Sequence, residues 1–558
     1  MTRHTQVDAV SPPGSLRTYG PAVMVYLLAT AVTGAYQWGD SIDYAIEIRA
    51  GMRYWEFGHL FWRPLGTLLA ALVPPSYVPC AQDERTAILL LLVAVCWLSG
   101  LACVVWLRGL LRWAGVNGWP ADFAVAAFIL SQTFLNYTQT AASYIPGLAM
   151  LLLSCYLLAR ETQHERPYRW SGVGAGAALA AAVGFWFLYV WALPAALLLP
   201  LFLGGLDWRR FHLAARAAVV CVVVIGLCYS VALVNLHIAS VDGLRAWIAD
   251  ASHGVARVHG VSRAAFGFSR SFIHMGNDGV LFKRYLLHDP LNPTSAVDLL
   301  RLSLWKLALF YLFVLSLGIG LLFSPRGRRL LGLLAVAALP TIGFAIVWQG
   351  GGLERYLPLY PFLFLAVAGL FALQDVPLVC RVLALVFFLA ACVSNVTVMA
   401  RPTLWREQRR LTARVEGLQP LLKPNSRVLF VRDEVNGLER DFPLHGAGAG
   451  LPLEAAAAPS LEGNQHWRAT LAKRMFAVWD QGGDVWMAKR LLAAKPQPEW
   501  NWVEGDDPDL SWRDLSAFFR ALDTDDEVGG VDGFVRITPS AANRQRMNDI
   551  VSQGSHLH

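Results

Sequence analysis

Long apolar runs constrain the fold of this chain more than any other feature. A helix of about 20 apolar residues crosses the roughly 30 Å hydrocarbon core of a bilayer, and the 558-residue sequence, 55% hydrophobic and only 16% charged, contains eleven such runs. The pattern predicts an α-helical polytopic membrane protein with about 11 transmembrane helices. The runs lie near residues 20–38, 86–107, 120–136, 143–159, 172–188, 190–206, 214–236, 304–323, 330–348, 356–373 and 382–400.

Basic residues in the short connections predict the orientation. Arginines mark every second connection, which places those connections and the N-terminus in the cytoplasm. The segments 39–85 and 237–303 are then long outer loops, and the residues after 401 are extracytoplasmic. We expect a multi-pass membrane protein with a cytoplasmic N-terminus and an extracytoplasmic C-terminal region. This use of the basic residues also accounts for the net charge of +7, so no nucleic acid is expected as a partner.

The composition changes near residue 401. We predict a transmembrane domain over 1–400 and a small soluble α/β domain over 401–558. Short apolar stretches predict strands in "SRVLFVRDE", "GGDVWMAKRLL" and "GFVRITP", and helical periodicity appears in "HWRATLAKRMFAVWDQ" and "SWRDLSAFFRALD". The glycine-rich "GAGAGLPLEAAAA" is expected to be a loop. None of the eight cysteines has the spacing of a metal site.

Two aspartates follow the first apolar run directly. In "GDSIDYAIEIRAG", Asp40 and Asp43 are one helical turn apart at the membrane edge. In one interpretation Asp40 or Ser41 caps a helix and Asp43 complements the helix dipole. In the other, the two aspartates are functional carboxylates. The next stretch, "YWEFGHLFW", predicts an interfacial helix on the outer leaflet.

Cations gather at two further places on the predicted outer face. In "WQGGGLERYLPLYP", Arg355 is either an interfacial arginine paired with Glu354 or a bidentate binder of phosphate. The 237–303 loop breaks the positive-inside bias, and lipid phosphate is the nearest anion that explains it. Within residues 250–293 of this loop the basic residues are Arg257, Arg263, Arg270, Lys283 and Arg284, and Lys306 lies close by.

These pieces resemble the GT-C superfamily of membrane glycosyltransferases, which take a sugar from a polyprenyl-phosphate carrier on the outer face of a membrane. "GDSID" looks like the "GDS-x-acid" opening of several bacterial members, which resemble the protein O-mannosyltransferase and aminoarabinose-transferase branches. "HLFWRPLG" is similar to their "H-x-L-x-x-P-L" continuation, and "ERYLPLYP" to their "RYLLPLYP" element. The paired Asp-Glu of the O-mannosyltransferases is here replaced by two aspartates three residues apart, which leaves the choice between Asp40 and Asp43 open.

The resemblance implies an inverting transferase with a carboxylate base, Asp40 or Asp43. A polyprenyl phosphate leaves without protonation when cations stabilise it, so a base and a cationic clamp are sufficient. No cofactor or metal is required, although a divalent ion is compatible. The expected partners are membrane lipids, a polyprenyl-phosphate-linked sugar donor and an acceptor that is a lipid, a glycan or a protein. A lipid-linked polysaccharide ligase and a lipid or sugar transporter are the alternatives. We expect the donor phosphate to be held by Arg355, Tyr356, Lys283, Arg284 and Lys306, and the acceptor or the base to be oriented by His59, Arg63 and Glu354.

Overall fold

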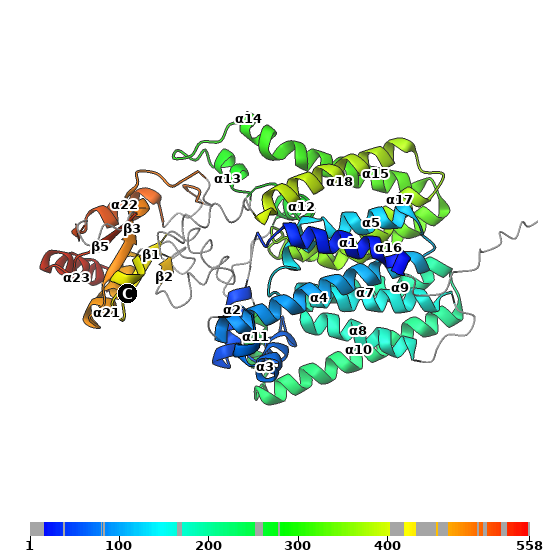
Figure 1. Cartoon of the computed structure of the whole chain (residues 1–558), viewed down its shortest axis with the longest axis horizontal. Coiled ribbons are helices and arrows are strands. Elements are labelled where there is room, and N and C mark those ends of the chain that lie inside the picture. The colour runs from blue at the N-terminus through cyan, green and yellow to red at the C-terminus, as the bar shows by residue number, and fades with distance from the viewer. Residues whose placement is uncertain are drawn as a thin grey trace, which may run out of the picture.

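The computed structural model divides into a large helical bundle and a smaller region built on a sheet (Figure 1). The helical bundle ends with α18, and the first strand of the sheet begins at Arg427. The structure describes residues 16–36, 40–79, 81, 84–163, 170–251, 260–276, 279–401, 418–430, 453–455, 467–498, 502–505, 510–525 and 533–555.

Eight segments in the described residues are long and apolar enough to cross a membrane, and three shorter apolar helices accompany them. Together they fall on all eleven predicted spans. The prediction of a polytopic helical membrane protein with a small C-terminal α/β region is therefore confirmed. The eight are α4 (Glu84–Trp113), α7 (Tyr144–Glu161), η2 with α9 (Phe187–Gly204), α10 (Trp208–Asn235), α14 through α15 (Ala296–Leu322), α16 (Pro325–Val347), η4 with α17 (Glu354–Ala372) and α18 (Leu378–Met399), and the shorter three are α1 (Leu16–Val32), α5 (Trp119–Ile129) and α8 (Ser171–Phe185).

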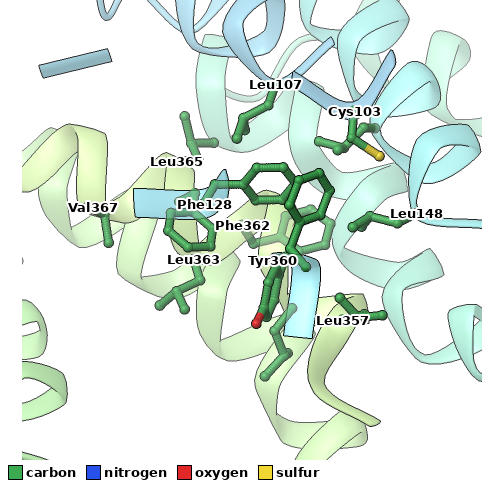
Figure 2. Packing of buried hydrophobic residues seen from close by; sticks show 14 of the residues in the cluster. Cys103, Leu107, Phe128, Leu148, Leu357, Tyr360, Phe362, Leu363, Leu365 and Val367 are labelled. Carbon is green, nitrogen blue, oxygen red and sulfur yellow. The ribbon is translucent and has the colours of Figure 1, made fainter. Parts of the chain in front are cut away.

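The bundle has a dry aromatic interior and an apolar exterior. The Phe128 ring packs edge-on against Tyr360 and Phe364, with ring centroids 6.0 and 5.3 Å apart, and Figure 2 shows Phe128 and Tyr360 among the surrounding leucines. On the outside, α10 leaves Val222 70% and Val234 74% exposed. An apolar surface this extensive requires a bilayer or another apolar partner to cover it.

The predicted outer loops carry short helices. After α1 the chain forms α2 (Ser41–Ala50), then a series of turns, then α3 (Trp62–Leu72). The prediction of an interfacial helix over "YWEFGHLFW" was wrong, since that stretch is turns up to Phe61 and the helix begins at Trp62. Buried Glu56 and His59 hold those turns in the interior. The other long loop contains α11 (Val241–Asp250), α12 (Val261–Arg270), α13 (Val280–Leu286) and the start of α14.

The C-terminal region is built on a mixed five-stranded sheet with the order β2-β1-β3-β5-β4. The three predicted strands and two predicted helices are present. The glycine-rich stretch predicted to be a loop contributes Leu453–Ala455 as β2, which pairs in parallel with β1 at the sheet edge. The strands are β1 (Arg427–Phe430), β2 (Leu453–Ala455), β3 (Val485–Ala488), β4 (Thr524–Asp525) and β5 (Phe534–Ile537), and the helices are α21 (Trp467–Asp480), α22 (Trp512–Arg520) and α23 (Ala541–Ser555).

The two ends of the bundle are fastened together. Thr33, just after α1, forms a β-bridge with Ala400, just after α18. The Arg401 guanidinium donates to the carbonyl oxygens of Thr33 at 2.8 Å and Thr30 at 3.2 Å. The first long loop and the chain leading to the sheet therefore leave the bundle at the same end.

Candidate functional site

Asp40 stands at the first turn of α2 without capping it. It occupies the N-cap position, but its side chain accepts no hydrogen bond from the helix. Ser41 is buried and its Oγ accepts instead from the Ala141 amide at 3.1 Å, which ties α2 to the segment before α7. The interpretation of Asp40 as a capping residue, whose stabilisation comes from such a bond, is therefore wrong. Its carboxylate, half-buried, forms no hydrogen bond or ion pair with the described residues.

Asp40 influences three aromatic side chains. Its charge acts on Tyr44, on His59 and on Tyr144. The His59 ring lies edge-on to Tyr44, with centroids 5.6 Å apart, and its centroid is 6.0 Å from that of Tyr144. Asp43 lies on the exposed side of α2. The local fold therefore directs Asp40, rather than Asp43, towards this aromatic group.

His59 is fixed through one ring nitrogen. Its Nδ1 lies 2.6 Å from Ser143 Oγ and 3.2 Å from the Phe185 carbonyl oxygen. A carbonyl only accepts, so Nδ1 carries the proton and Nε2 has the lone pair. Burial lowers the pKa of His59, which favours this neutral form. His59 can thus accept a hydrogen bond beside Asp40.

Arg63 lies at the centre of a buried ion cluster. Its Nε donates to Glu47 Oε2 at 2.8 Å, and its terminal nitrogens contact Glu47 and Glu56. Burial opposes the charge of Arg63, but Glu56, Tyr44 and Glu47 outweigh it and raise the pKa of the guanidinium. The guanidinium also lies 4.8 Å above the Tyr44 ring. Since Arg63 is only 1% exposed, it can orient Tyr44 and α2.

The Glu354–Arg355 pair faces the same aromatic group from the other half of the bundle. Tyr137 donates its hydroxyl to Glu354 Oε2 at 3.3 Å, and the Tyr137 ring packs edge-on to Tyr144 at 4.9 Å. The charge of Glu354 acts on Tyr144, as that of Asp40 does. Arg355 pairs with Glu354 at 3.3 Å and keeps 20% of its side chain exposed. Two of the three predicted constellations therefore converge on Tyr144.

Tyr356 and Lys306 have their polar groups engaged inside the protein. Tyr356 is buried, and its hydroxyl lies 2.6 and 2.7 Å from the carbonyl oxygens of Ala264 and Gly350. Lys306 Nζ donates to the His274 carbonyl oxygen at 2.7 Å and to Ser394 Oγ at 2.9 Å. Both side chains therefore stabilise the fold around the site through these hydrogen bonds.

His274 and Tyr36 form the wall of a pocket of about 240 Å³. Their rings pack edge-on with centroids 5.0 Å apart, and the Tyr36 amide donates to Asn136 Oδ1 at 2.7 Å. Tyr36 is four residues before Asp40, so their Cα atoms are at most about 14 Å apart. Asp40 itself is not among the residues that line this pocket.

Of the remaining predicted cations, Arg284 lines the same pocket as His274 and Tyr36. Arg284 is 3% exposed and donates to the carbonyl oxygens of Pro498 at 2.6 Å and Trp502 at 3.0 Å, which fastens α13 to the C-terminal region. Lys283, on the same helix, is half-buried and engaged in a polar interaction. Arg257 lies outside the described residues.

The sequence predictions missed the tyrosines. Tyr44 lies one turn after Asp40 in "GDSIDYAIEIRAG", and its position was the signal available for it. Tyr137 and Tyr144 lie at the connection between the predicted spans 120–136 and 143–159, which carries no arginine. Among the residues that the structure describes, no group of three or more His, Cys, Asp or Glu side chains could hold a metal ion.

Comparison with known proteins reveals similarity in overall fold. No family model and no curated protein matches the chain. Among solved structures, the chain is similar to ArnT from Cupriavidus metallidurans bound to undecaprenyl phosphate, with 14% identity, a TM-score of 0.49, and coverage of 95% of this chain and 98% of that one. It is also similar to the oligosaccharyltransferase of Archaeoglobus fulgidus, with 11% identity, a TM-score of 0.41, and coverage of 93% of this chain and 74% of that one.

Both of these proteins are GT-C glycosyltransferases. With identities of 11–14% and TM-scores below 0.5, these similarities assign no residue, no substrate and no family to this chain.

Proposed function

We propose that this protein is an inverting glycosyltransferase that moves a sugar from a polyprenyl-phosphate carrier to an acceptor at the outer face of a bacterial inner membrane. The observation that carries the proposal is that the charges of Asp40 and Glu354 both act on Tyr144, at the start of α7, and that Arg355 pairs with Glu354. A carboxylate and a cation at one membrane edge are the two groups that this reaction needs.

In the proposed reaction Asp40 is the general base. It accepts the proton of an acceptor hydroxyl or amine while the acceptor atom attacks the anomeric carbon. The bond between that carbon and the phosphate oxygen breaks, and the polyprenyl phosphate leaves with the electron pair. Arg355, which is partly exposed beside Glu354, would offset the charge of the leaving phosphate. Neutral His59 offers Nε2 to orient the acceptor.

Native mass spectrometry of the detergent-purified full chain tests the donor class. We expect the wild type to retain an added undecaprenyl phosphate and Arg355→Ala to lose it. Arg49→Ala is the matched control, because Arg49 is exposed and pairs with Glu84 at 3.4 Å, outside the aromatic group. Equal retention by Arg355→Ala and wild type would remove Arg355 from the phosphate site, and no retention by any form would count against the donor class.

A second measurement tests the reaction. A panel of undecaprenyl-phosphate-linked sugars is incubated with the protein, and the release of undecaprenyl phosphate is followed by liquid chromatography and mass spectrometry. We expect release by the wild type and none by Asp40→Asn. Full release by Asp40→Asn would exclude Asp40 as the base, and transport of an uncleaved donor across proteoliposomes would favour a transporter.

A further inference from the structure

Tyr44 presents a polar group that the fold leaves unsatisfied. The side chain is 0% exposed, and its hydroxyl oxygen has no hydrogen-bond partner among the residues that the structure describes. Buried hydroxyls are nearly always paired, because burial without a partner forfeits the hydrogen bonds made to water. Such an exception calls for an explanation in the molecule's function.

The carboxylate of Asp40, the N-cap residue of α2, lies one turn before Tyr44. The Tyr44 amide donates to the Asp40 carbonyl oxygen at 3.0 Å, so the two residues stand in the i, i+4 relationship. In a helix this spacing stacks the two side chains on one face, and the longer one leans towards the N-terminus, here towards Asp40. Asp40 is half-buried and forms no hydrogen bond with the described residues.

The surroundings keep the Tyr44 hydroxyl protonated. Burial, then the charges of Asp40 and Glu56, raise the pKa of Tyr44. The ring is held in place by Arg63, 4.8 Å above it, and by edge contacts with His59 and Trp62. A change of side-chain rotamer at Asp40 would therefore be enough to pair the two groups, with the phenol stationary.

We propose that Tyr44 is a positioning residue that donates its hydroxyl to Asp40 during turnover, holding one carboxylate oxygen so that the other receives the acceptor proton. This inference rests on the proposed function, because it takes Asp40 as the base. Other titratable and charged groups also lie around the Tyr44–Asp40 pair. They are Glu47 on α2, Glu56 and His59 in the turns, Arg63 on α3 and Tyr144 on α7.

Tyr44→Phe removes the hydroxyl and keeps the ring. We expect kcat for undecaprenyl phosphate release to fall about tenfold, the value of one hydrogen bond to a charged group, with KM for the carrier-linked sugar changed less than about twofold. The acidic limb of the pH–rate profile should move to higher pH, because a donated hydrogen bond favours the carboxylate form. Thermal stability should stay equal or rise, since the variant removes an unsatisfied buried group.

Tyr26→Phe is the matched control. Tyr26 is also 0% exposed, but its hydroxyl donates to the Trp97 carbonyl oxygen at 2.7 Å. This variant should lower the unfolding midpoint and leave kcat unchanged. A Tyr44→Phe protein with wild-type kcat and pH profile, or one that loses stability as Tyr26→Phe does, would overturn the inference. Full release by Asp40→Asn would instead sink the proposed function, a separate result.

Discussion

Tyr137 and Glu354 are 217 residues apart in the chain, and the hydroxyl of the first donates to Oε2 of the second at 3.3 Å. This bond joins α6 (Gln132–Tyr137) to the turn that opens α17. The neighbouring Tyr144 experiences the charges of both Glu354 and Asp40. The hydrogen bond therefore links the two halves of the candidate site.

The two aspartates of α2 should differ in their importance. Asp40→Asn keeps the size of the side chain and removes its basicity, so we expect transfer to fall by about 10²- to 10⁴-fold, the usual contribution of a general base. Asp43 lies on the exposed side of the helix. Asp43→Asn should therefore lower the transfer rate by less than about threefold, much less than the loss of a general base would. The rate of undecaprenyl phosphate release measures both, and a reversed order would assign the base to Asp43.

The Arg63 cluster should matter strongly for stability. Arg63→Leu leaves Glu47 and Glu56 without their buried guanidinium, and removing one partner of a buried ion cluster costs about 3–5 kcal/mol. Arg49→Ala breaks a pair whose side chains are 53% and 54% exposed, and should cost less than about 1 kcal/mol. Unfolding followed by intrinsic fluorescence compares the two variants. Equal losses would show that the cluster contributes no more than a surface pair.

His274 should make the protein less stable in acid. Burial, with Lys306 and then Arg270, lowers the pKa of His274 to about 3 from its ordinary value of 6.5. The unfolded chain therefore binds the proton first, and stability should decline as pH falls from about 6.5 towards 3, by up to about 1.4 kcal/mol per pH unit. His274→Gln keeps an acceptor for Gln132 and removes this contribution. The change in unfolding midpoint between about pH 7.5 and about pH 5 should be smaller for His274→Gln than for the wild type. The same change in both proteins would contradict the expectation.

Arg284 should hold the C-terminal region in place. Arg284→Gln loses hydrogen bonds to the Pro498 and Trp502 carbonyl oxygens, each worth about 1.5–3 kcal/mol when the donor is charged. Hydrogen exchange measured by mass spectrometry should become faster around residues 496–498 and 502–505. Arg301→Gln, at an exposed position on the same outer segment, should leave that exchange unchanged. Unchanged exchange in Arg284→Gln would show that other contacts carry the docking.

The apolar runs predicted the membrane helices because each helix carries its own hydropathy signal. The strands β1, β3 and β5 were predictable for the same local reason. The pairing of Tyr137 with Glu354 was not, because it depends on how helices distant in sequence pack. Leu453–Ala455 is too short to show a strand pattern, and its place beside β1 is a long-range pairing. The sequence predicts Arg284 as an available cation in an outer loop. It is bound instead by carbonyl groups more than 200 residues later in the chain, which no local pattern indicates.

The bridge between Thr33 and Ala400 links the topology of the two parts of the chain. Because α1 and α18 both end at this bridge, the Asp40 loop and the sheet region lie on one side of the membrane whichever way the bundle is inserted. A reporter enzyme fused after His558 therefore also reports the side on which Asp40 works. Any acceptor would have to approach from the compartment that the sheet region occupies.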